Sequence, residues 1–160
     1  FLLLLLMGIS LTKCKSPLDL NVGIVVPTPM DNPQSDAKIE LGKKLFFDTR
    51  LSIDGTVSCA TCHKPGRAFT DNLTVSEGIK GQHTERNSPS ILNAAFLKTA
   101  MFDAHLETLE LQVIVPIQEK TEMGHNMKDL MKVLRADPEY QWAMSPVDVG
   151  HRSSGSRRDR

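Results

Sequence analysis

The chain has 160 residues, enough for one modest domain with a core, and 40% of them are hydrophobic. Nineteen basic residues balance nineteen acidic ones without a sustained basic stripe, which excludes a nucleic-acid-binding surface. Three cysteines are too few for a disulfide framework that would stabilise a chain of this size.

Residues 1–14 predict an export leader. The apolar run 1–11 has the length of a signal-peptide core and is short of the roughly 20 residues of a membrane span. It lacks an initiating methionine and a charged start, so we expect a truncated leader. Residues 11–14 are similar to a lipoprotein box, with Lys13 where a small residue is usual. Cys14 is thus either a lipidated membrane tether or an ordinary leader cysteine, and both alternatives indicate the periplasm or cell envelope.

Residues 15–35 predict an extended linker, because they contain four prolines and few periodic apolar residues. We expect the folded domain to occupy residues 36–143. Its first helix has Ser35 as a suitable N-cap and ends at Asp48. The apolar positions of this helix recur at helical spacing; they are Ala37, Ile39, Leu41, Leu45 and Phe46.

From Ser52 to Asn87 no helical or strand period is sustained, and glycines interrupt the chain repeatedly. Such a long loop needs a cofactor to supply the core that it wraps. Three further helices are expected. One starts with Ser88 as N-cap and runs to about residue 96, one runs from about 106 to 115 and ends at Pro116, and one is capped by Asn126 and ends at 137–138. Without a strand pattern, the fold class is mostly α.

The segment Cys59-Ala60-Thr61-Cys62-His63 carries the clearest chemical signal, because C-x-x-C-H is the attachment signature of c-type haem. Cys59 and Cys62 would form thioether bonds to one porphyrin. His63 would then ligate the iron from the proximal side. The segment predicts a haem c protein with redox or oxygen chemistry.

Two other interpretations of the motif are weaker. Structural zinc sites use four ligands, usually from two such pairs, and the third cysteine, Cys14, lies far away in the leader. A thioredoxin-like dithiol follows a buried strand, whereas residues 52–58 are polar and rich in turn formers.

Four ordered segments resemble the N-terminal haem domain of bacterial di-haem cytochrome c peroxidases, whose relatives include maturation enzymes for protein-derived quinone cofactors. The segments are 41–48, 58–63, 86–90 and 109–123, within a similar stretch from 40 to 141. The resemblance implies a cytochrome c-like haem domain with long haem-wrapping loops. It also implies that hydrogen peroxide is reduced to water with electrons from a small c-type cytochrome or a cupredoxin.

The resemblance assigns roles to three further residues. By position, Gln112 and Glu122 match the distal-side pair of the family, and Asn87 matches a residue at a calcium site between two haem domains. A carboxylate such as Glu122 can take a proton from one peroxide oxygen and return it to the other. The neutral amide of Gln112 can orient the peroxide without competing for that proton. Without the resemblance, both side chains would be interpreted as solvent-exposed helix or turn residues.

Several positions depart from the family pattern. Ile79 stands where many members have a second histidine ligand, which indicates an open distal face or ligation by another residue, with His83 as a weaker candidate. Residues 102–105 read Phe-Asp-Ala-His where the family usually has Trp-Asp-Gly-Arg, so an electron route through Phe102 and a propionate contact by His105 are in doubt. We interpret His125 as a surface residue.

The second haem domain of the family, with its own C-x-x-C-H, does not occur in the 160 residues. We therefore expect a fragment that is unable to complete the catalytic cycle, with residues 144–160 as a disordered or artefactual tail. A homodimer is compatible with the sequence. The competing function is a mono-haem electron carrier with a methionine as sixth ligand; the available methionines are Met101, Met123, Met127 and Met131. A haem-containing sensor or structural domain also stays open.

Overall fold

The computed structural model describes residues 25–101 and 105–144. The expected leader with Cys14, most of the expected tail, and Phe102 lie outside these residues. None of the helices in the described ranges is both long enough and apolar enough to cross a membrane.

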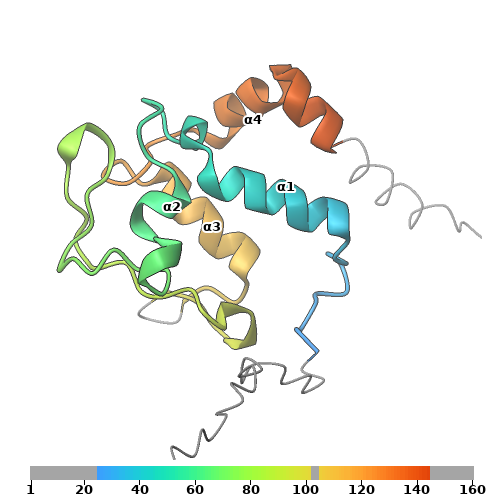
Figure 1. Cartoon of the computed structure of the whole chain (residues 1–160), viewed down its shortest axis with the longest axis horizontal. Coiled ribbons are helices and arrows are strands. Elements are labelled where there is room, and N and C mark those ends of the chain that lie inside the picture. The colour runs from blue at the N-terminus through green and yellow to red at the C-terminus, as the bar shows by residue number, and fades with distance from the viewer. Residues whose placement is uncertain (1–24, 102–104, 145–160) are drawn as a thin grey trace, which may run out of the picture.

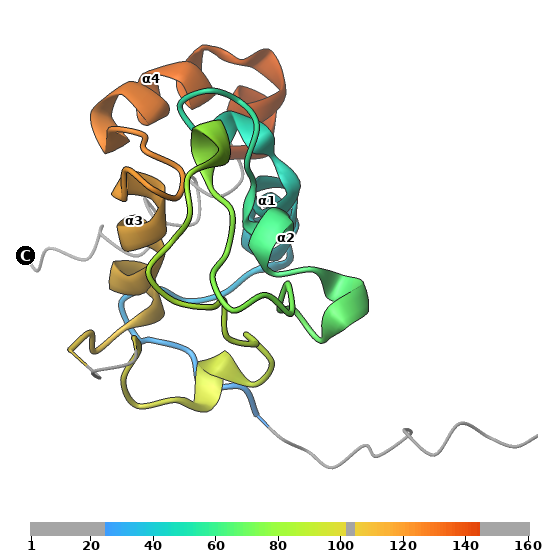
Figure 2. The same ribbon diagram turned by 90° about the vertical axis from the view of Figure 1, so that its left-hand side faces the viewer.

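The described chain is helical, which confirms the mostly α fold class. It contains α1 (Asp36–Phe47), α2 (Cys59–Cys62), α3 (Leu109–Gln118) and α4 (Met127–Ala136), joined by loops with short 3₁₀ turns (Figure 1). Within these ranges the only β-type pairing is two isolated bridges. The 3₁₀ turn η4 (Ala94–Phe96) lies at the end of the molecule opposite α4 in both views (Figures 1 and 2).

Two helices form where local capping signals predict them. The Ser35 side chain accepts a hydrogen bond from the Lys38 amide at the start of α1, and Asp48 ends that helix. The Asn126 side chain accepts from the Lys128 amide at the start of α4, and Asp137 ends it. Both predictions are confirmed, because capping depends on residues adjacent in sequence.

The prediction for α3 is wrong at both ends. The helix begins at Leu109, where the Thr108 side chain accepts from the Leu111 amide, and it continues through Pro116 to Gln118. A proline removes only its own amide donor. The ladder resumes beyond it, since the Glu119 amide donates to the Val115 carbonyl at 2.9 Å.

The expected helix from Ser88 to about residue 96 is also wrong, because this segment forms only η4. Asn93 adopts a left-handed conformation with φ of 61°, which interrupts a right-handed helix. The Leu92 amide donates to the Ser90 side chain at 3.2 Å rather than to a helical carbonyl. Serine hydroxyls that compete for backbone donors disfavour a helix in this way.

The core draws on helices and loops together. Met123 is 3% exposed within it, and Leu41 and Leu45 of α1 pack against it from outside. The buried members of the cluster are Leu51, Val57, Ile79, Ile117, Met123, Leu130, Leu134 and Tyr140. Three of these belong to the region 48–81, so the long loop is fixed to the helices by its own apolar side chains.

A polar clasp joins the end of α1 to the chain after α4. The buried Tyr140 hydroxyl donates to Asp48 Oδ2 at 2.5 Å, and the Arg50 guanidinium binds both Asp48 and Asp137. Burial raises the pKa of Asp48, but the hydrogen bonds from Arg50 and Tyr140 outweigh burial and lower it to about 2. The clasp holds the ends of the two helices together through an ionised carboxylate.

The described part of the expected linker contacts the helices. Asn32 Nδ2 donates to Glu110 Oε1 at 2.7 Å, and Lys38 Nζ donates to Asn32 Oδ1 at 3.0 Å. The segment before α1 is thereby attached to both α1 and α3.

Candidate haem site

The single-turn helix α2 carries the two thiols of the attachment motif. The Ser58 amide donates to Thr61 Oγ1 at 3.0 Å at its start, and the His63 amide donates to the Cys59 carbonyl at 2.8 Å at its end. Cys59 and Cys62 are three positions apart, which places both side chains on one side of the turn. Both thiols are free and half-buried. This spacing fits two thioether bonds to the edge of one porphyrin.

The environment of the thiols does not support the zinc and dithiol alternatives. Burial raises the pKa of Cys59 and of Cys62, whereas a reactive redox thiol has a lowered pKa. In the described ranges no strand precedes α2, and no three His, Cys, Asp or Glu side chains cluster as metal ligands.

The imidazole of His63 has one nitrogen engaged by the protein. Nδ1 lies 3.1 Å from the Phe69 carbonyl oxygen. This contact favours the tautomer in which Nδ1–H donates to the carbonyl and Nε2 keeps its lone pair. The half-buried imidazole therefore presents Nε2 as a ligand. Together with the two thiols, this donor set fits a covalently bound haem.

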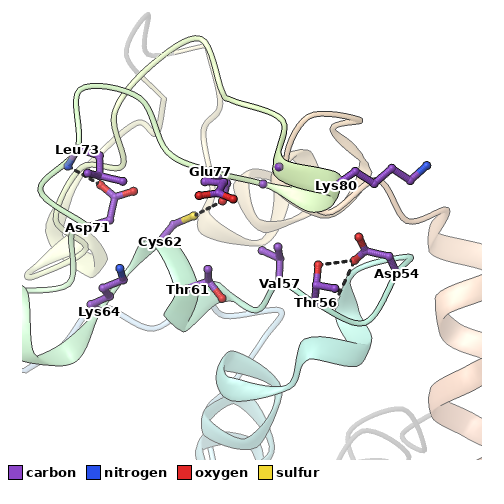
Figure 3. A pocket seen from close by; sticks show the side chains of 12 residues that line it. Asp54, Thr56, Val57, Thr61, Cys62, Lys64, Asp71, Leu73, Glu77 and Lys80 are labelled. Carbon is purple, nitrogen blue, oxygen red and sulfur yellow. Dashed lines mark hydrogen bonds between the residues drawn. The ribbon is translucent and has the colours of Figure 1, made fainter.

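A pocket of about 450 Å³ lies beside α2 (Figure 3). Cys62 lines it together with residues of the 71–81 loop, and the Cys62 thiol donates weakly to the Glu77 carbonyl at 3.9 Å. Lys80 points away from the other labelled side chains (Figure 3). His63, Gln112 and Glu122 do not line this pocket. It therefore gives access to one thiol without containing the predicted catalytic residues.

Glu122 lies on the turn after α3, half-buried, with its amide donating to the Glu119 carbonyl at 3.0 Å. Burial raises the pKa of Glu122, and repulsion from the Glu119 carboxylate raises it further. The charge of Glu122 in turn contributes to the raised pKa of Cys62. The Ile79 amide donates to the Glu122 carbonyl at 2.9 Å, and the Glu77 carbonyl accepts from the Cys62 thiol at 3.9 Å, so the turn that carries Glu122 adjoins the loop that contacts the attachment motif.

Two glycines allow the loop after α2 to contact the turn after α3. A side chain at Gly78 would overlap the Thr121 carbonyl. Gly124 has φ of +61°, and a Cβ atom there would lie 2.6 Å from Ile79 Cδ1. Ile79, which lies next to Gly78 and contacts Gly124, is only 3% exposed. The structure therefore places a buried apolar side chain at position 79.

The other predicted residues are more dispersed. Gln112 is half-buried on α3, and its Nε2 donates to Met101 Sδ at 3.9 Å. His83 and Asn87 are exposed in the loop region. His125 is half-buried rather than on the surface, with Nδ1 3.2 Å from the Asn126 carbonyl.

A buried polar network beside Cys62 was missed by the sequence interpretation. Ser76 Oγ lies 2.7 Å from Ser88 Oγ, and both side chains offset part of the rise in the pKa of Cys62 that burial causes. Asp71 is 2% exposed and also bonds to Ser76. Burial raises the pKa of Asp71, but the bonds from Ser76 and the Leu73 amide outweigh it and lower the pKa. Isolated polar residues in a loop carry no periodic signal, so the sequence gives no indication of this network.

Comparison with known proteins gives consistent results. Residues 36–147 match the family model for di-haem cytochrome c peroxidase. The chain is 41% identical over 115 residues to the methylamine utilization protein MauG of Methylorubrum extorquens, covering 72% of this chain and 33% of that protein. It is 41% identical over 108 residues to cytochrome c551 peroxidase of Pseudomonas aeruginosa, covering 68% and 31%. The chain thus spans about a third of the length of these curated relatives.

Solved structures agree. The crystal structure of a MauG-like protein associated with microbial copper homeostasis superposes with a TM-score of 0.72 at 40% identity, covering 81% of this chain and 39% of that one. The diheme peroxidase BthA from Burkholderia thailandensis gives 0.65 at 27% identity, covering 71% and 33%. Together with the family match, these similarities confirm the resemblance drawn from the four segments and the cytochrome c-like fold. The chain belongs to the di-haem cytochrome c peroxidase family, which implies haem c as its cofactor.

Proposed function

We propose that this chain is a c-type haem domain that reduces hydrogen peroxide. Cys59 and Cys62 attach the haem, and His63 Nε2 ligates the iron. The observation that carries the proposal is the position of Glu122, a half-buried carboxyl with a raised pKa, on a turn hydrogen-bonded to the loop that contacts Cys62. Perturbed carboxyls beside a cofactor site are candidates for acid–base catalysis.

The haem, when bound, would supply the iron at which peroxide is reduced, and an external donor would supply the electrons. The balanced reaction takes H₂O₂, two protons and two electrons to two molecules of water. Ionised Glu122 would take a proton from one peroxide oxygen and return it to the other, which would leave as water. Gln112 orients the peroxide through its amide. Burial and the Glu119 carboxylate raise the pKa of Glu122, which makes its carboxylate a stronger base than a solvent-exposed glutamate.

The packing around the site limits which side chains could act as a second protein ligand to the iron. Ile79 cannot ligate iron, and it is packed against Gly124. Met123 is buried in the core cluster, and Met127 and Met131 pack against that cluster, so three of the candidate methionine ligands are engaged in packing. These contacts disfavour those three methionines as ligands to the iron, which leaves Met101, beside Gln112, as the candidate for the electron-carrier alternative.

Further parts of the proposal rest on family membership. Electrons come from a small c-type cytochrome or a cupredoxin through a second haem, which relatives carry in a further domain. Asn87, exposed in its loop, is a calcium ligand at the contact with that domain. We assign residues 1–14 to a leader, 15–35 to a linker, 36–143 to the haem domain and 144–160 to a tail. The protein then acts in the periplasm or cell envelope, either free or tethered through Cys14.

The absorption and spin state of the ferric, haem-loaded chain test the proposal. A high-spin spectrum that changes on addition of peroxide supports it. A low-spin histidine–methionine spectrum that does not respond to peroxide contradicts it and supports the electron carrier instead.

A further inference from the structure

Three of the four family-like segments contact Phe69 or its immediate neighbours, and one of them, through His63, contacts the Phe69 carbonyl. This carbonyl oxygen lies 3.1 Å from His63 Nδ1. We propose that segment 86–90 and α1 brace Phe69 so that its carbonyl fixes the His63 ring and lowers the reduction potential of the iron. The inference goes beyond the peroxidase reaction, and it rests on the proposed attachment of haem next to His63.

The backbone around Phe69 is strained. Ala68 and Phe69 have φ angles of 53° and 58°, so two consecutive residues with side chains adopt the left-handed conformation. This conformation is unfavourable for residues with side chains, and it persists only where the surroundings hold it. Within the loop, the Phe69 amide donates to the Lys64 carbonyl at 3.0 Å. Arg67 donates to the Asp71 carbonyl at 2.8 Å.

Segment 86–90 holds the loop on both sides of Phe69. The Ser90 hydroxyl donates to the Ala68 carbonyl at 2.6 Å. The Thr70 hydroxyl donates to the Ser88 carbonyl at 2.7 Å. These two bonds span 22 and 18 residues of sequence, so they are tertiary contacts and not part of a local turn. They fix the residues immediately before and after the one whose carbonyl faces His63.

The end of α1 contacts the side chain of Phe69. The Phe46 ring packs edge-to-face on the Phe69 ring, with centroids 6.1 Å apart and an interplanar angle of 68°. Edge-to-face pairs have a preferred geometry, so this contact limits rotation of Phe69. The ring is held by α1 while the flanking backbone is held by segment 86–90.

The position of the carbonyl controls how strongly His63 donates electrons to the metal. A hydrogen bond from Nδ1–H to an acceptor fixes the tautomer and increases the basicity of Nε2. A more basic ligand stabilises ferric over ferrous iron. Loosening the brace lets the carbonyl move away, which weakens this effect and raises the reduction potential.

The test is a spectroelectrochemical titration of the full, haem-loaded chain. Ser90→Ala removes one brace bond, and we expect the ferrous-to-ferric ratio at a fixed potential to rise about threefold. This change corresponds to a rise of roughly 28 mV in the reduction potential, at 59 mV per tenfold change for one electron. Ser90→Thr keeps the hydroxyl and is expected to restore the parent potential. Ser35→Ala, which removes the N-cap hydroxyl of α1, is the control and is expected to leave the potential unchanged.

Thr70→Val removes the other bond with little change in shape, and it provides the same test if Ser90→Ala fails to fold. Parent-like potentials in these variants would overturn the inference, as would an equal rise in Ser35→Ala. A parent chain without covalently attached haem would overturn the proposed function, and this inference with it. Attached haem with an unshifted potential in Ser90→Ala overturns the brace alone.

Discussion

The Ile79 amide donates a hydrogen bond to the Glu122 carbonyl oxygen at 2.9 Å. This bond joins the loop that follows the attachment motif to the turn that carries the proposed acid–base residue. Ile79 also packs against Gly124, so the two segments are in contact through both backbone and side chain. The position of Glu122 therefore depends on a loop that lies some forty residues earlier in the chain.

The close approach at Gly78 gives a first prediction. Gly78→Ala places a methyl group against the Thr121 carbonyl, and we expect a loss of about 1–3 kcal/mol in the free energy of unfolding, as for other overpacked sites. Gly42→Ala in α1 is the control, because nothing lies within 4 Å of its added atom and alanine is favoured in helices by about 1 kcal/mol. Denaturant titration measures both, and equal stability of the two variants would contradict the assigned contact.

Glu119 gives a prediction about pH. Burial raises the pKa of Glu122, and repulsion from the Glu119 carboxylate raises it further. If ionised Glu122 is the base, the rate of the peroxide reaction rises with pH through this pKa. Glu119→Gln removes the repulsion and lowers the pKa of Glu122, so the rising part of the profile moves to lower pH. Stopped-flow rates across the acidic and neutral range measure the shift. An unchanged pH profile would show that the Glu119 carboxylate does not influence the group whose ionisation controls the rate.

The hydrogen bond between Tyr140 and Asp48 predicts how the stability of the fold depends on pH. Tyr140→Phe removes the hydrogen bond to ionised Asp48 and should cost about 2 kcal/mol near neutral pH. The folded pKa of Asp48 is about 2, below its ordinary 3.8, so its contribution is present above 3.8 and is lost as pH falls towards 2. The difference between parent and variant therefore shrinks over that interval.

Urea titrations at several pH values measure this dependence. Glu139→Gln is the matched control, since it removes the exposed carboxylate that pairs with Lys44 at 2.5 Å, and exposed pairs contribute little. A loss that is independent of pH in Tyr140→Phe would show that packing, not the bond to Asp48, explains the effect.

The attachment motif gives a prediction about haem content. Cys59→Ser or Cys62→Ser alone leaves one thioether bond, and the double variant leaves none, so its haem is extracted by acidified acetone. Cys14→Ser, a change outside the motif, is the control and should keep covalent haem. Haem staining after denaturing electrophoresis measures attachment. Covalent haem in the double variant would show that another residue forms the bond.

Local signals in the sequence predicted part of the fold. Ser35 and Asn126 cap α1 and α4 as expected, because a cap is formed by residues a few positions apart. The expected helix after Ser88 does not form, since the Ser90 hydroxyl accepts from Leu92 and donates to Ala68 across the loop. The second of these contacts spans 22 residues, so helix signals read from neighbouring residues do not reveal it.

The site was predictable to a similar extent. The two thiols and His63 are contiguous and were identified from spacing, whereas the assignments of Glu122 and Gln112 required the resemblance to a family. The Phe69 carbonyl was not predictable, because it is a backbone atom presented by a strained loop. Asp71 and Ser76 were missed because their role depends on burial, which follows from tertiary packing alone.

The rate at which the ferric, haem-loaded chain reacts with hydrogen peroxide tests the central claim most directly. Stopped-flow absorbance on the parent, on Glu122→Gln and on Glu110→Gln separates the proposed acid–base residue from another glutamate at α3. We predict that Glu122→Gln slows the reaction by about 10²–10⁴-fold, the usual contribution of a general acid–base, while Glu110→Gln matches the parent. A parent that does not react with peroxide, or a Glu122→Gln variant that reacts as fast as the parent, would contradict the account.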